Sequence, residues 1–92
     1  MDMLKIGLLK NLTLLLVEDD EELKESIKET LALFFKNVFV AENGLEALDI
    51  YSQNSIDLII TDYVMPIMNG YELCKNIREK NRKIPLVIMS NY

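Results

Sequence analysis

The chain has 92 residues, of which 50% are hydrophobic and 27% are charged, and this is the composition of a single globular domain. Fifteen acidic and ten basic residues give a net charge of −5, which argues against nonspecific nucleic-acid binding. The sequence has no histidine, so a histidine base or ligand is excluded, and one cysteine excludes an internal disulfide. No apolar run reaches the ~20 residues of a membrane span and no signal peptide is recognisable, so we expect a cytoplasmic protein without membrane contact.

Apolar runs alternate with helical patterns along the chain. Residues 1–12 are ambiguous, and we interpret them as an N-terminal extension ahead of a domain at residues 13–92. Short apolar runs predict four strands, at residues 13–18, 38–41, 57–61 and 85–89. The intervening segments predict three helices, at about residues 21–35, 45–53 and 70–80. The residues expected on the inner helix faces are Leu23, Ile27, Leu31 and Phe34, then Leu45, Leu48 and Tyr51, then Leu73, Cys74 and Ile77. This order predicts an α/β fold, a doubly wound parallel sheet with helices on both faces.

Side chains with oxygen atoms follow three of the predicted strands. Glu18, Asp19 and Asp20 follow the first strand, Asp62 follows the third, and Ser90 follows the fourth. The carboxyl ends of parallel strands lie along one edge of a sheet, so we expect these groups to converge there. Asp20 is also a plausible N-cap of the next helix.

Such a cluster of carboxylates has a chemical consequence. Two like charges 4 Å apart cost about 4 kcal/mol at an effective dielectric near 20, so the cluster is expected to bind a cation or hold a proton. In the absence of histidine, a hard ion such as Mg²⁺ is the better fit. An aspartate beside such an ion can attack a phosphoryl group. Taken singly, acids after a strand often only cap a helix, and Asp62 alone is more often a turn residue; the joint placement at three strand ends favours a site.

Three motifs carry a resemblance to a known family. Residues 15–20 read Leu-Leu-Val-Glu-Asp-Asp, residues 62–70 read Asp-Tyr-Val-Met-Pro-Ile-Met-Asn-Gly, and residues 87–90 read Val-Ile-Met-Ser. Over roughly residues 13–92 the chain resembles the receiver domain of bacterial two-component response regulators, which are CheY-like. The resemblance implies a flavodoxin-like receiver fold with strand order 2-1-3-4-5, without its last helix-strand-helix.

The resemblance also implies roles for individual residues. Asp62 would be the phospho-acceptor that takes phosphate from a sensor histidine kinase. Mg²⁺ would be held by Glu18, Asp19, Asp62 and the backbone carbonyl of Val64. Ser90 would be the switch hydroxyl. The domain would not be an enzyme but would switch an unknown output domain or partner protein.

The family's catalytic lysine follows a fifth strand and has no counterpart in this sequence, since Lys83 precedes the fourth strand. We therefore expect small phosphodonors to phosphorylate the chain slowly or not detectably. We also expect the fourth strand to be an uncovered edge through which copies associate as a homo-oligomer.

Two other functions were weighed. A Mg²⁺-dependent phosphatase of the haloacid dehalogenase type also uses a strand-end aspartate, but such enzymes carry Asp-x-Asp after the first strand, whereas Asp62 ends the third. A receiver-like interaction module that phosphorylation does not switch is the alternative that remains open.

Overall fold

The computed structural model describes residues 7–89, so the predictions made for Ser90 and for the first six residues lie outside the described part. A short 3-10 turn, η1 (Leu9–Asn11), precedes the domain. The strands are β1 (Thr13–Val17), β2 (Asn37–Ala41), β3 (Leu58–Asp62) and β4 (Leu86–Met89). The helices are α2 (Glu21–Leu31), α3 (Gly44–Gln53) and α4 (Gly70–Lys80). Except for α2, these elements match the predicted ranges to within one residue at each end.

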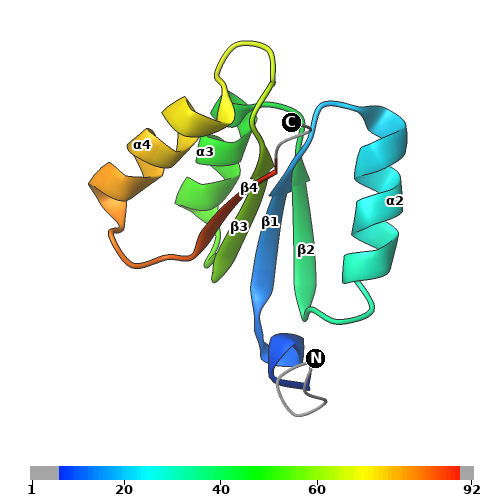
Figure 1. The fold of residues 1–92 in the computed structure, drawn as a ribbon. Coiled ribbons are helices and arrows are strands. Elements are labelled where there is room, and N and C mark those ends of the chain that lie inside the picture. Colours follow the sequence, from blue (N-terminus) through cyan, green and yellow to red (C-terminus); the bar gives the residue numbers. More distant parts are fainter. Residues whose placement is uncertain (1–6, 90–92) are drawn as a thin grey trace.

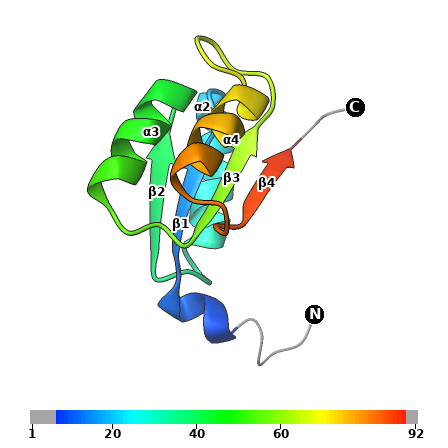
Figure 2. The same cartoon turned by 90° about the vertical axis from the view of Figure 1, so that its left-hand side faces the viewer.

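The four strands form one parallel sheet in the order β2-β1-β3-β4. Helices α3 and α4 cover one face of the sheet, and α2 lies against the other (Figures 1 and 2). This arrangement confirms the doubly wound α/β fold. It also confirms, over four strands, the order that the resemblance implied.

The core is built around β1, the strand with neighbours on both sides and helices on both faces. All five residues of β1 are buried, which is the pattern of a central parallel strand. The larger part of the core lies on the side of α3 and α4, and its members are Leu15, Val17, Ala41, Ala47, Ile59, Met65, Leu73, Ile77 and Ile84. The site described below is therefore attached to the most completely packed strand of the domain.

Each helix begins at a polar residue that satisfies a free backbone donor. Asp20 accepts from the Leu23 N–H at 3.0 Å, which confirms the predicted N-cap of α2. Asn43 caps α3 in the same way. Asn69 and Glu72 form a reciprocal capping box at α4, with bonds of 2.8 and 3.1 Å. These caps fix the points at which the chain leaves the carboxyl edge of the sheet.

The predicted end of the first helix is wrong, because α2 stops at Leu31 rather than near Phe35. Phe34 N–H donates to the Leu31 carbonyl in a tighter turn, and Phe35 packs inward with 9% exposure. The Lys36 N–H then donates to the carbonyl of Leu12 at 2.9 Å. Tertiary contacts with the start of β1 therefore end a helix that the sequence pattern would continue.

Two of the predicted inner-face residues are also wrong. Leu23 is 45% exposed and Leu45 is 53% exposed, whereas Lys24 has only 6% exposure. The Lys24 ammonium lies 2.8 Å from Glu21 and 3.1 Å from Glu42, and the bond to Glu21 is the main cause of the raised pKa of Lys24. Because this ion pair draws Lys24 toward the end of β2, α2 is rotated so that Leu23 faces away from the core.

Replacing Gly70 tests how tightly α4 is held against the end of β3. A Cβ at this position would lie 2.5 Å from the Asp62 carbonyl oxygen, and this backbone atom cannot move aside cheaply. We expect Gly70→Ala to lower the free energy of unfolding by about 1–3 kcal/mol in urea titrations. Gly7→Ala, where a Cβ would meet nothing within 4 Å, is the control and should cause no loss. Equal effects of the two substitutions would contradict this packing.

Candidate metal-binding site at the strand ends

The site begins where β1 and β3 end side by side. Val17 is paired with Thr61, so the next residue of each strand, Glu18 and Asp62, reaches the same level of the sheet. The Glu18 N–H donates to the Ala41 carbonyl at 3.0 Å, which extends the pairing with β2 by one residue. Backbone register therefore brings together two carboxylates that are 43 positions apart in the sequence.

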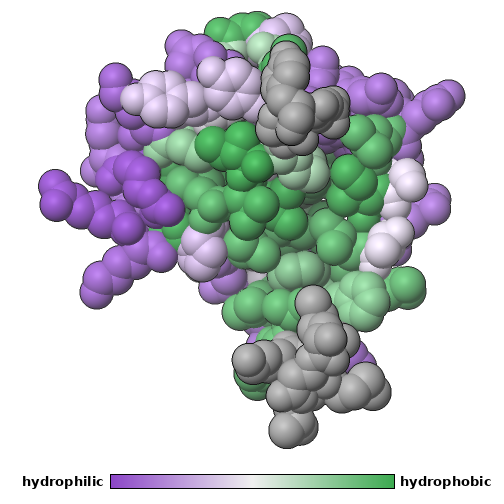
Figure 3. All heavy atoms as spheres, in the orientation of Figure 1, coloured by the Kyte–Doolittle hydropathy of each residue, from purple (hydrophilic) through white to green (hydrophobic). Residues whose placement is uncertain are grey.

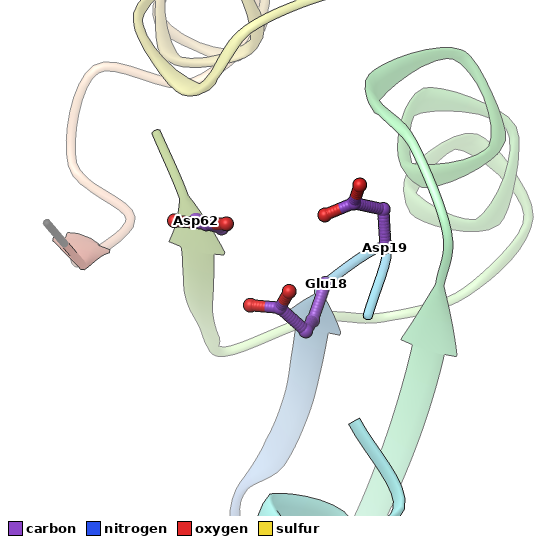
Figure 4. A group of neighbouring side chains, drawn as sticks. All are labelled: Glu18, Asp19 and Asp62. Atoms are coloured by element: carbon purple, nitrogen blue, oxygen red, sulfur yellow. The ribbon is translucent and has the colours of Figure 1, made fainter. Parts of the chain in front are cut away.

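Three carboxylates meet at this edge. Each of Glu18, Asp19 and Asp62 offers an oxygen, and these oxygens all lie within 4.8 Å of one another. Figure 4 shows the three side chains turned toward a common space beyond the ends of β1 and β3. Glu18 is buried, Asp62 is half-buried and Asp19 is exposed. The cluster thus has a closed floor and an open side from which an ion or a phosphoryl donor can enter.

The electrostatics of the cluster favour a bound cation. Burial raises the pKa of Glu18, the charges of Asp62 and Asp19 raise it further, and the Asp20 N–H, which donates to Glu18, acts in the opposite direction. A buried carboxylate beside two others is costly when ionised, so a proton or a cation is needed to balance it. Carboxylate oxygens are hard ligands, and they fit Mg²⁺.

The carboxylates line a hollow of about 520 Å³. Its lining residues are Glu18, Asp19, Asp20, Leu23, Ile27, Asp62, Val64 and Met89. No lysine or arginine is among them, so within residues 7–89 this hollow is lined by acids and apolar groups alone. The exposed Leu23 forms part of the wall, which gives its outward position a place in the site.

Asp62 is held in position by its neighbours. Its Oδ1 accepts from the Tyr63 N–H at 2.8 Å, and no described residue donates to its Oδ2. The Gly70 N–H donates to the Tyr63 carbonyl at 2.8 Å and so closes the loop between β3 and α4. One oxygen of the acceptor is thereby fixed by the backbone, and the other is available for chemistry or for a metal.

The sequence-based prediction and the structure can now be compared residue by residue. The structure brings Glu18, Asp19 and Asp62 together, as parallel strand ends require, and it places Val64 on the wall of the hollow. The roles of these residues as metal ligands and acceptor stay predictions, and Ser90 lies outside the described residues. The sequence analysis did not assign Leu23, Ile27 or Met89 to the site. The signal for Leu23 and Ile27 was their position one and two turns into the helix that follows the acids.

The fold and the site together define a doubly wound α/β protein with an acidic pocket at the carboxyl edge of its sheet. The family model for response regulator receiver domains matches residues 14–92. The "Probable transcriptional regulator ycf29" of Pyropia yezoensis is 43% identical over 79 residues, which cover 84% of this chain and 36% of that protein. The chain belongs to the response regulator receiver domain family.

Solved structures agree with this assignment. The N-terminal domain of an uncharacterized protein from Wolinella succinogenes superposes with a TM-score of 0.83 at 29% identity, covering 89% of this chain and 66% of that one. The non-phosphorylated HemR receiver domain from Leptospira biflexa has a TM-score of 0.77 at 37% identity, covering 85% of this chain and 63% of that one. The chain spans about a third of the length of the curated relatives it matches. Among the helices of residues 7–89, none has the length and apolar character needed to cross a membrane.

The raised pKa of Glu18 predicts a pH dependence of stability. The folded state holds this proton more tightly than the unfolded chain, so the free energy of unfolding falls as the pH rises from the ordinary glutamate pKa through the raised one. Glu18→Gln keeps an acceptor for the Asp20 N–H but removes the charge. We therefore expect it to stabilise the metal-free protein more at about pH 7 than at about pH 4.

Chemical denaturation in the presence of a chelator measures this difference. Glu25→Gln, at an exposed position on α2 outside the hollow, is the control for loss of an acid and should show no such gain. An effect of Glu18→Gln that is the same at both pH values would contradict the electrostatic account.

Proposed function

We propose that this chain is the phospho-acceptor part of a two-component response regulator. In this proposal Asp62 takes a phosphoryl group from the phosphohistidine of a sensor histidine kinase. The observation that carries the proposal is the meeting of Glu18, Asp19 and Asp62 oxygens within 4.8 Å at the end of β3. Membership in the receiver family supports it.

Mg²⁺ would be held by Asp19, by Asp62 and by the Val64 carbonyl, with Glu18 acting through water. When bound, the ion offsets negative charge on the transferring phosphoryl oxygens. The donor set fits this ion, because it is made of oxygens and includes a buried carboxylate with a raised pKa.

The reaction assigned to Asp62 is a phosphoryl transfer. An Oδ atom of Asp62 forms a bond to phosphorus while the phosphorus–nitrogen bond of phosphohistidine breaks. The electron pair of that bond stays on the imidazole nitrogen of the kinase. The chain contributes position and an open approach, since the Tyr63 N–H fixes Oδ1 and the described residues leave Oδ2 without a donor. The product is an aspartyl phosphate on this chain, so we propose a signalling substrate of the kinase rather than an enzyme.

We propose that phosphorylation switches an output domain or a partner protein in the cytoplasm. Curated relatives are described as transcriptional and response regulators, which supports a regulatory output. The net charge of −5 supports a role in which these residues make no direct nucleic-acid contact.

Phosphorylation by phosphoramidate with Mg²⁺ tests the acceptor. Intact-mass spectrometry should show slow addition of one phosphoryl group, and Asp62→Asn should abolish it. Asp19→Asn should slow the addition by about 10-fold or more, because ligand groups and their supports set metal affinity. Glu25→Gln is the matched control and should behave as the unaltered chain does.

Chelation with EDTA should stop the addition. Phosphate that is added equally to the Asp62→Asn variant, or equally without a divalent ion, would contradict the proposal. Failure of any addition at Asp62 would favour the alternative of an interaction module that phosphorylation does not switch.

A further inference from the structure

Strand β4 lies at the border of the sheet and has an unusual composition for that place. Within residues 7–89 its only strand neighbour is β3. Figure 2 shows β4 at this border, with α4 over one face of the sheet rather than along the outer side of the strand. Its four residues are apolar, and Val87 and Ile88 are 48% and 41% exposed. Edge strands usually carry charges or bulges that prevent pairing, and β4 has neither in its sequence.

The hydrogen-bond pattern shows which backbone groups of β4 are free. The Pro85 carbonyl accepts from the Ile59 N–H at 3.0 Å, and the Met89 carbonyl accepts from the Tyr63 N–H at 3.1 Å. Backbone groups alternate in direction along a strand, so those of Leu86 and Ile88 point away from β3. Pro85, which lacks an N–H, belongs to the set that faces β3. The outer side of the strand therefore offers two complete donor–acceptor pairs.

We propose that β4 pairs with β4 of a second copy of this chain, antiparallel and about a two-fold axis at Val87. In this register Leu86 of one copy exchanges hydrogen bonds with Ile88 of the other, and Val87 lies opposite Val87 of the second copy. The two four-stranded sheets become one continuous sheet. This inference concerns assembly and does not depend on phosphorylation of Asp62.

Charge selects the antiparallel direction and the occupant. Asp62 is paired with Met89, so the acidic hollow lies at the carboxyl end of β4. The segment before β4 is basic, with Lys80, Arg82 and Lys83 within four residues. Antiparallel pairing brings this basic segment of one copy toward the acidic hollow of the other. Parallel pairing would instead set the two acidic hollows side by side.

The second copy would thus supply what the hollow lacks. No lysine or arginine lines the hollow among the described residues, and Lys24, the one described cation with a salt bridge, is bonded to Glu21 and Glu42 instead. The Lys83 N–H and the Ile84 N–H both donate to Asn81, so the basic segment is held in a turn at the start of β4. A cation within one Debye length of about 10 Å would still lower the repulsion among the acids.

Apolar surface near β4 would also be covered. Figure 3 shows hydrophobic side chains gathered in the middle of the face seen in Figure 1. Because Ile59 belongs to the core beneath α3 and α4, the register places Ile60 and Val87 on the opposite face of the sheet. Contact of the two Val87 side chains across the axis would therefore bury part of this face.

Cysteine cross-linking tests the register directly. In a Cys74→Ser background, Val87→Cys should form a disulfide-linked dimer under mild oxidation, because opposed residues of a non-hydrogen-bonded pair lie about 4.5 Å apart at Cα. Ile88→Cys is the matched control, with similar exposure but a separation from its own copy of roughly 8 Å, too long for a disulfide. Cross-linking of Val87→Cys alone supports the proposal. Equal cross-linking of both variants, or of neither, overturns it.

Sedimentation velocity at rising concentration tests the interface in the unaltered 92-residue chain, which should sediment as a dimer that added salt weakens. Ile88→Pro removes an outward N–H without touching the ladder to β3, and by symmetry two interchain bonds are lost. Its dimer dissociation constant should rise at least about tenfold, whereas that of Ile88→Ala should rise less. Lys83→Glu should also weaken the dimer, chiefly at low salt. A chain that stays monomeric at every concentration overturns the proposal, and the cysteine pair decides it if Ile88→Pro fails to fold.

Discussion

The parallel pairing of β1 with β3 is the constraint on which the rest of the structure depends. Its register ends with Val17 opposite Thr61, so the carboxylates of Glu18 and Asp62 are forced to the same level of the sheet. The repulsion that results is opposed by the packing of β1, whose five residues are all buried. Each fully buried aliphatic side chain contributes roughly 1.5–3 kcal/mol, so the central strand can hold a cluster of like charges in place.

The loop between β3 and α4 connects this strained site to the remainder of the fold. Gly70 lies against the Asp62 backbone so closely that a Cβ would meet the carbonyl oxygen at 2.5 Å. The same loop contains Ile67, whose φ of 73° and bond from the Met68 N–H to the Pro66 carbonyl form a γ-turn. A tight loop and a capped helix therefore determine where the acceptor aspartate sits, and changes in either would be felt at the carboxylates.

Most of the fold and the heart of the site could be predicted from the sequence, because they follow from local rules. Apolar runs located the strands, and the parallel topology alone required Asp19 and Asp62 to converge. The errors lie where tertiary contacts outweigh periodicity. Lys24 is buried because Glu42, 18 residues away, accepts its hydrogen bond, and this displaces Leu23 from the core. The helix ends at Leu31 because Lys36 must reach β1. No spacing rule within a helix contains those partners.

The central claim is that Glu18, Asp19 and Asp62 form one cation site. Paramagnetic broadening of amide resonances by Mn²⁺, used in place of Mg²⁺, tests this most directly. The account predicts that residues 18–20 and 62–64 lose intensity first, and that Asp19→Asn suppresses the loss. Broadening centred on another part of the chain, or unchanged by Asp19→Asn, would contradict it.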